Sequence, residues 1–303
     1  PADDPPPTRR RHADEGPVDA RSTVPRPADP TMTHPIPHPL DAAIALEPLG
    51  EDRFAGTPHP AWANMVGPFG GITAATLLQA TRIHPARIGE PVSLTVNYVA
   101  ALTDAPFEIA AHPVPGGRSV QHWTLALRQD GRVATTATAV TALRRATWSA
   151  SELAAPAVPP ARDVPVTPGF AKVEWPKRYE MRFHAGPWPD LSVDAELPDS
   201  LSTMWIRDEP PRPLDAPALA AICDAFYPRT FRRRQRFVPA GTVSMTIHFH
   251  ADAAALAAQG SRPVLGVARG LRFADGFFDQ RAEIWSDAGV LLASSMQSVW
   301  FKE

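Results

Sequence analysis

The side chains of this 303-residue chain that could do chemistry are few. His248 and His250 stand two apart on one strand face, a spacing that a metal ion can use, but no third ligand follows in a recognisable pattern. We therefore expect surface or interface histidines and no metal site. Cys223 would need a neighbouring base to act as a nucleophile, so a small buried residue is the favoured interpretation. The G-x-S-x-G motif of α/β-hydrolases does not occur.

Asp224 is a carboxylate inside an apolar segment, APALAAICDAFYPRTF (216–231), whose spacing predicts a helix. Asp215 is a candidate N-cap, and Pro217 falls near the first turn. A lone aspartate in such a helix is usually exposed or satisfied by structural partners. Its type alone therefore does not establish a catalytic role.

The elements that must position these residues form a repeat. VSLTVNYVA (92–100) and VSMTIHFHA (243–251) alternate apolar and polar side chains in the same phase, as half-buried strands do. Residues 116–140 align with 275–299, and each reads as a strand, a turn and a second strand. The offset grows between the two matches, which indicates an insertion, expected in 251–263.

A helical stretch precedes each copied strand, and the two stretches differ. GGITAATLLQATRI (70–83) begins with Gly70 and Gly71 and has no carboxylate, whereas the second stretch contains Asp224. Each repeat therefore predicts short strands, one central helix and about four antiparallel strands, which is a sheet wrapped round a helix.

The repeat offsets also match polar residues of the second copy with residues of the first. Gln297 aligns with Thr138, and Thr242 aligns with Pro91. The polar set is complete only in the second copy, so we expect one active site per chain.

Four segments together resemble the acyl-CoA thioesterase II type family, whose members are double hotdogs. They are FGG (69–71), CDAFYP (223–228), GTVSMTIHFH (241–250) and ASSMQSVWFK (293–302). The resemblance runs from about residue 40 to the end. It implies an α+β fold of two tandem hotdogs in one chain, each an antiparallel sheet wrapped round a central helix.

The resemblance implies that Asp224, Thr242 and Gln297 form a hydrolytic triad for acyl-CoA thioesters, with no cofactor. Asp224 would accept a proton from a water molecule or orient that water, which Thr242 and Gln297 would hold. The N–H groups at Gly70 and Gly71 are candidates for binding the oxyanion or substrate.

The chain departs from the family pattern after the threonine, where Val243 and its two successors replace the usual acidic and histidine residues. Substrate preference is therefore left open, and 200–226 resembles a divergent branch of the family. One alternative is a hotdog protein that binds an acyl chain or acyl-CoA without catalysis. A hydratase or dehydratase ranks last, because those enzymes use a histidine near the helical acid.

Composition predicts the domain organisation. We expect a disordered proline-rich arm at 1–39, an N-terminal hotdog at 40–148, a linker at 149–171 and a C-terminal hotdog at 172–303. Met32 is a candidate start of the natural chain.

Charge and cysteine content limit the partners. A formal net charge of −2 gives no field that would attract nucleic acid, and the apolar runs are too short to cross a bilayer. The single cysteine is compatible with the cytoplasm. For the basic run FRRRQRF (231–237) we favour a solvated loop over contact with coenzyme A phosphates, and we expect a homodimer or larger assembly.

Overall fold

The computed structural model describes residues 36–169, 172–190 and 195–303. Most of the arm expected at 1–39 lies outside the described residues, and its last residue, Pro39, begins helix α1 (Pro39–Ala43). The segment expected as a linker contains a 3-10 helix, η2 (Ala161–Asp163), and its Val164 packs on the sheet.

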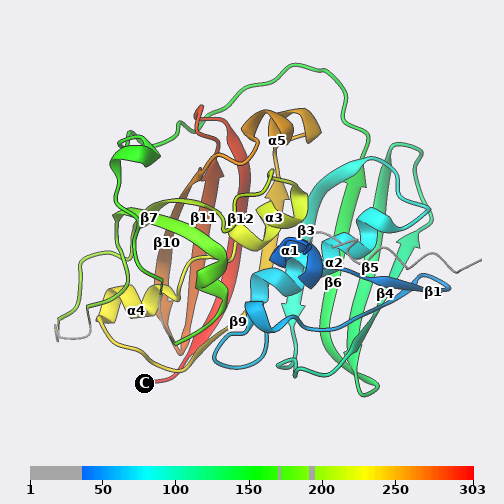
Figure 1. Ribbon diagram of the computed structural model, residues 1–303, viewed down its shortest axis with the longest axis horizontal. Coiled ribbons are helices and arrows are strands. Elements are labelled where there is room, and N and C mark those ends of the chain that lie inside the picture. The colour runs from blue at the N-terminus through cyan, green and yellow to red at the C-terminus, as the bar shows by residue number, and fades with distance from the viewer. Residues whose placement is uncertain (1–35, 170–171, 191–194) are drawn as a thin grey trace, which may run out of the picture. The chain divides into compact units, whose positions relative to one another are not determined.

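Within the described residues, twelve strands form one antiparallel sheet (Figure 1). Their order is β1-β2-β4-β5-β6-β3-β9-β12-β11-β10-β8-β7. The first half contributes β1 (Glu47–Gly50), β2 (Arg53–Gly56), β3 (Glu90–Tyr98), β4 (Phe107–Val114), β5 (Val120–Gln129) and β6 (Arg132–Ala142). The second contributes β7 (Tyr179–Ala185), β8 (Ser202–Asp208), β9 (Ala240–Phe249), β10 (Val264–Ala274), β11 (Phe277–Trp285) and β12 (Leu291–Phe301).

The two halves meet where β3 pairs with β9, and the strand order outward from this junction is the same on both sides. Thr95 lies opposite Thr246, and their hydroxyl oxygens are 3.0 Å apart. These residues are 151 positions apart, which is the offset of the sequence repeat. Equivalent residues that face each other mark a pseudo-two-fold axis, so the predicted repeat and the double hotdog architecture are confirmed.

The helices lie on one face of this sheet, with α2 and α3 next to each other over its centre (Figure 1). The helices are α2 (Gly70–Ile83), α3 (Ala216–Ile222), α4 (Arg229–Arg234) and α5 (Ala253–Gln259), with 3-10 helices η1 (Pro60–Trp62) and η3 (Trp175–Arg178). Helix α2 has the predicted bounds, and α5 occupies the predicted insertion. Buried apolar side chains of α2, α3 and both halves of the sheet form one core.

The single helix predicted over 216–231 is wrong. Asp215 caps α3 as expected, accepting a hydrogen bond from the N–H of Ala218, but α3 ends at Ile222. A separate helix, α4, begins after Pro228. The proline ring disfavours helical geometry at the residue before it, so one helix cannot run through this position without a break. Asp224 therefore lies in the turn after α3 rather than in the middle of a helix.

The alignment of Gln297 with Thr138 is also wrong, by one residue. Leu94 of β3 pairs with Ala139, and its repeat equivalent Met245 pairs with Gln297. Gln297 and Ala139 are both buried on the inner face, whereas Thr138 is exposed on the outer face. Ala139 thus takes the place of Gln297 in the first half.

Candidate active site

Asp224, Gln297 and Thr242 are joined by a chain of hydrogen bonds. The Nε2 of Gln297 donates to Oδ1 of Asp224 over 2.9 Å. The Oγ1 of Thr242 donates to Oε1 of Gln297 over 3.0 Å. Because Thr242 uses its proton in this bond, its hydroxyl oxygen can still accept one from a ligand or a water molecule.

A β-bulge turns Thr242 toward this site. Ser298 pairs with Ser244, but the next pair joins Val299 to Thr242, so Val243 is an extra residue in β9. Residues opposite each other on antiparallel strands share a face, and Val299 is buried on the inner face with Gln297. Simple alternation would place Thr242 on the outer face with Ser244, and the bulge reverses that.

The start of α2 packs directly on the carboxylate. A Cβ on Gly70 would lie 2.7 Å from Oδ2 of Asp224, so only glycine leaves room there. The backbone N–H of Gly71 donates a hydrogen bond to Asp224. The hydroxyl of Tyr98 donates to the carbonyl oxygen of Gly70 over 2.9 Å and holds this end of the helix.

These residues line a cavity of about 690 Å³ to which both halves contribute. Its walls are mostly apolar and aromatic, and they include Phe69, Leu102, Trp175, Trp188, Phe226, Phe231, Phe237 and Trp300. Its polar side chains include Asp224, Thr242, Gln297, Gln280 and Tyr98. A few polar groups in an apolar hollow are typical of small-molecule sites.

Burial governs the ionisation of Asp224. Removal of the carboxylate from bulk water raises its pKa to about 7, against the lowering effect of the hydrogen bonds from Gln297 and Gly71. Burial and the nearby charge of Asp224 raise the pKa of Tyr98 well above its usual value, so that phenol stays neutral. Asp224 is therefore the group of this set that changes charge near neutral pH.

The other reactive side chains lie apart from this chemistry. Burial raises the pKa of the Cys223 thiol well above its usual value, which disfavours a thiolate nucleophile. His248 is exposed, and His250 is hydrogen bonded to the hydroxyl of Ser294. Among the described residues, no three or more His, Cys, Asp or Glu side chains are grouped as a metal site would need.

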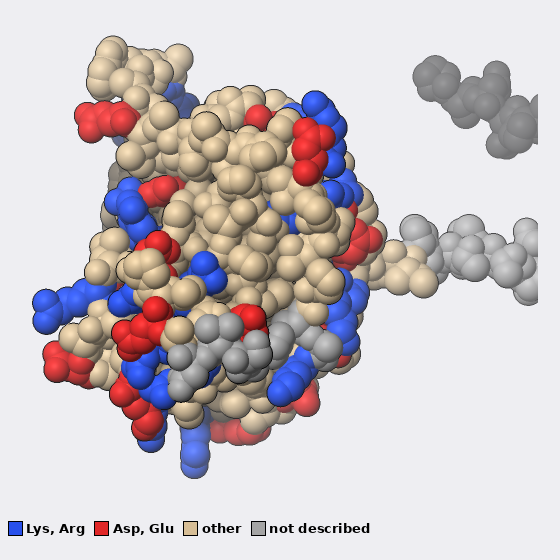
Figure 2. All heavy atoms as spheres, turned by 90° about the vertical axis from the view of Figure 1, so that its left-hand side faces the viewer, with Lys and Arg blue, Asp and Glu red and all other residues tan. Residues whose placement is uncertain are grey.

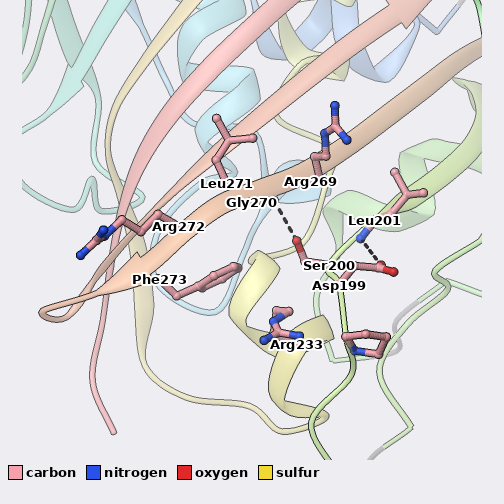
Figure 3. A pocket seen from close by; sticks show the side chains of 10 residues that line it. Asp199, Ser200, Leu201, Arg233, Arg269, Gly270, Leu271, Arg272 and Phe273 are labelled. Atoms are coloured by element: carbon pink, nitrogen blue, oxygen red, sulfur yellow. Dashed lines mark hydrogen bonds between the residues drawn. The ribbon is translucent and has the colours of Figure 1, made fainter.

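A second hollow of about 490 Å³ lies beside α4 and β10 (Figure 3). Arg233, Arg269 and Arg272 line it, and Figure 3 shows Arg269 and Arg272 pointing away from each other. Its wall includes Ser200, whose hydroxyl accepts a hydrogen bond from the N–H of Gly270. The three arginines do not converge on one point as a phosphate site requires.

The basic run 231–237 is not the solvated loop that we favoured, because its first four residues belong to α4. Arg234 forms ion pairs with Glu196 and Glu303, and Arg236 also lies within ion-pair distance of Glu303. On the face seen in Figure 2, acidic and basic residues are interspersed around an uncharged area. Neither sign dominates that face.

Tyr98 and Gln280 are among the polar residues of the cavity that sequence reasoning missed. The repeat could have indicated Tyr98, because the equivalent residue of the second copy is Phe249, which lacks the hydroxyl.

Gln280 lies opposite Gln121 in the ungapped sequence match, so that match gives no contrast. In the structure Ala139 pairs with Trp123 as Gln297 pairs with Gln280, so Trp123 takes the place of Gln280 in the first half.

Comparison with known families identifies the chain. The acyl-CoA thioesterase N-terminal domain matches residues 59–142, and the acyl-CoA thioesterase C-terminal domain matches residues 152–301. Together these segments cover well over half of the sequence. The chain belongs to the acyl-CoA thioesterase family. No curated protein matches this thioesterase family member significantly.

Solved structures agree with this family fold. A conserved protein of unknown function with a hot dog fold from Alicyclobacillus acidocaldarius is 47% identical, with a TM-score of 0.84 over 88% of this chain and 99% of that one. A putative thioesterase II from Thermobifida fusca is 20% identical, with a TM-score of 0.72 over 87% and 97% of the two chains. An acyl-CoA thioesterase II from Mycobacterium marinum is 19% identical, with a TM-score of 0.66 over 87% and 98%. The last two share the fold.

In the parts of the chain that the structure describes, no helix is both long and apolar enough to cross a membrane.

Proposed function

We propose that this protein hydrolyses acyl-CoA thioesters to a free fatty acid and coenzyme A. One observation carries the proposal: Asp224, Gln297 and Thr242 form a hydrogen-bonded chain at the wall of an apolar cavity. The carboxylate can take a proton, the hydroxyl oxygen can accept from water, and the apolar walls suit an acyl chain. Membership of the acyl-CoA thioesterase family supports the same substrate class.

In the proposed reaction, a water molecule held between Asp224 and Thr242 attacks the thioester carbonyl carbon. Its proton passes to the carboxylate of Asp224, a carbon–oxygen bond forms and the carbon–sulfur bond breaks. The leaving thiolate of coenzyme A takes up a proton, so one water molecule is consumed and no covalent enzyme intermediate forms. Gln297 keeps Asp224 oriented through the hydrogen bond to Oδ1.

Gly70 and Gly71 have different roles in this proposal. The N–H of Gly71 is directed to Asp224, so it helps to fix the base. Gly70 lines the cavity in the first turn of α2, where N–H groups have no partner inside the helix. We assign the N–H of Gly70 to the oxyanion that develops on the substrate carbonyl.

Replacement of the base tests the proposal. Asp224→Asn keeps the size of the side chain and removes its ability to take a proton, so release of free thiol from acyl-CoA should fall at least about 1,000-fold. The assay should use short, medium and long acyl-CoAs. A variant with wild-type turnover would refute the role of Asp224. A wild-type chain that binds acyl-CoA without releasing thiol would instead favour the non-catalytic acyl-CoA binding protein.

Location and assembly are part of the same proposal. The single cysteine, Cys223, is buried and free, which suits a reducing compartment, and we propose the cytoplasm. The homodimer or larger assembly expected from the sequence stays a prediction.

A further inference from the structure

Arg229 is a cation buried completely beneath the wall of the cavity. Its Nη1 donates to the carbonyl of Ser200 and the hydroxyl of Ser202, over 3.2 and 2.9 Å. Its Nε donates to the carbonyl oxygen of Tyr227 over 2.9 Å, and Nη2 donates to the same oxygen. The guanidinium also stacks on the Tyr227 ring, 4.4 Å from its centre.

All of these partners are neutral, and Arg229 forms no ion pair with any residue that the structure describes. Burial lowers its pKa to about 10, so it stays charged at neutral pH. A buried charge without a counter-ion is costly for stability, and such groups are kept where they serve a function. We therefore expect the charge of Arg229 to act on a functional neighbour.

The remaining partner of Arg229 points to the cavity. Its Nε also donates to Oε1 of Gln280 over 3.0 Å. Arginine can only donate hydrogen bonds, so the oxygen of the Gln280 amide must face it and the NH₂ group must face elsewhere. Gln280 is 2% exposed, lines the cavity, and pairs across the strands with Gln297. Among the described residues, none accepts a hydrogen bond from its Nε2.

The Nε2 of Gln280 is therefore a buried, oriented donor beside Gln297. Directly opposite residues on antiparallel strands have Cβ atoms about 5 Å apart, so Gln280 is within reach of a group bound at Gln297. The cation on its oxygen polarises the amide and strengthens Nε2–H as a donor. A donor of this kind suits an oxygen on which negative charge develops.

We infer that Gln280 donates a hydrogen bond to the thioester carbonyl oxygen of the substrate, and that Arg229 is the positioning residue that orients it. The inference rests on the proposed function. Gln280 supplies a second oxyanion donor, from the sheet, in addition to the N–H of Gly70 from α2.

Gln280→Met tests the donor, because methionine keeps the length of the side chain and removes the N–H groups. We expect kcat to fall about 100-fold, with KM within about twofold and the acid limb of the pH profile unchanged. Gln280→Glu is the second variant: it gives Arg229 a charged acceptor, which keeps the fold, and it should lower kcat similarly because it presents no N–H to the cavity.

Gln121→Met is the matched control. Gln121 is a buried glutamine of β5 in the first half, and its amide binds the N–H of Ile88 and the carbonyl of Ala86 away from the cavity. We expect this variant to lose stability and keep kcat. Circular dichroism and thermal unfolding report whether each variant folds.

Arg229→Lys tests the positioning role through a double-mutant cycle. Lysine keeps the charge but cannot hold the amide with the same fork of donors. We expect kcat to fall about tenfold in the wild-type background and to change little in the Gln280→Met background, because the two residues act on one oxygen. A purely structural Arg229 would lower kcat equally in both.

The outcomes separate the two proposals. Wild-type release of thiol, its loss in Asp224→Asn and full kcat in Gln280→Met would overturn this inference alone. A higher KM with unchanged kcat in Gln280→Met would also overturn it, because the bond would then serve ground-state binding. A wild-type chain that releases no thiol would overturn the proposed function and this inference with it.

Discussion

Asp224 is a carboxylate whose charge is set by what surrounds it. Burial raises its pKa to about 7, and the N–H groups of Gln297 and Gly71 favour the ionised form. The proposed base must be ionised to accept a proton, so kcat/KM should fall as pH drops below about 7. Removal of either hydrogen bond to Asp224 should therefore raise its pKa further.

Gln297→Met should move this acid limb to higher pH. The substitution removes the N–H that stabilises the charged carboxylate, so the pKa of Asp224 rises by about one unit. The rate of thiol release measured between pH 5 and 9 reports the shift. Ser298→Ala changes the adjacent, outward-facing residue and should leave the limb in place. An unmoved limb in Gln297→Met would contradict the assigned hydrogen bond.

The same pKa predicts how stability depends on pH. The pKa of Asp224 is higher in the folded chain, about 7 against 3.8, so between these values the folded state binds more protons. Its contribution to stability is thus present below about pH 4 and is lost as pH rises through 7. At pH 8, Asp224→Asn should unfold with a free energy about 2 kcal/mol higher than the wild type, with water in the cavity reducing the full effect. Near pH 4 this difference should disappear, and urea unfolding at both pH values measures it.

At the scale of elements, α2 begins with two adjacent glycines that have different neighbours. A Cβ on Gly70 meets the carboxylate of Asp224, whereas a Cβ on Gly71 would lie 2.6 Å from the backbone oxygen of Ala221 in α3. The first clash involves a side chain, and the second involves the backbone of a neighbouring helix.

Gly70→Ala and Gly71→Ala should therefore fail in different ways. The first displaces Asp224, so kcat should drop at least about tenfold with the melting temperature nearly unchanged. The second must push α2 and α3 apart and should cost about 1 to 3 kcal/mol of stability. Thermal unfolding compares the two variants directly, and thiol release measures the loss of kcat in Gly70→Ala. Equal losses of stability would show that the two glycines are not distinguished by their contacts.

Local pattern predicted the regular elements and missed the irregular ones. The periodicity of 70–83 predicted α2 to the residue, because the segment is helical along its whole length. The apolar pattern does not predict the bulge at Val243, because a valine is typical of a strand whether or not it is paired. The bulge nevertheless reverses the direction of the Thr242 side chain. The end of α3 was missed for a similar reason: the apolar spacing of 216–231 continues past the point where Pro228 forces a new start. The site residues came from the family resemblance, and their convergence depends on both of these irregular features.

At the scale of the whole molecule, the duplicated fold has one complete polar set. The pseudo-two-fold axis between Thr95 and Thr246 relates the halves of the sheet. At the positions equivalent to Thr242 and Gln297, the first half has Pro91 and Ala139, neither of which has a polar side chain. The first half instead supplies Gly70 and Tyr98 to the site in the second.

This division predicts that each chain binds one substrate. In Asp224→Asn, where turnover is blocked, titration with acyl-CoA in a calorimeter should give a stoichiometry of one per chain. Thr242→Val with Gln297→Met in that background should weaken binding, whereas Thr138→Val on the outer face of the first half should leave the affinity unchanged. Two equal sites per chain would mean that the first half binds substrate without the polar set. The asymmetry of the repeat would then not determine where acyl-CoA binds.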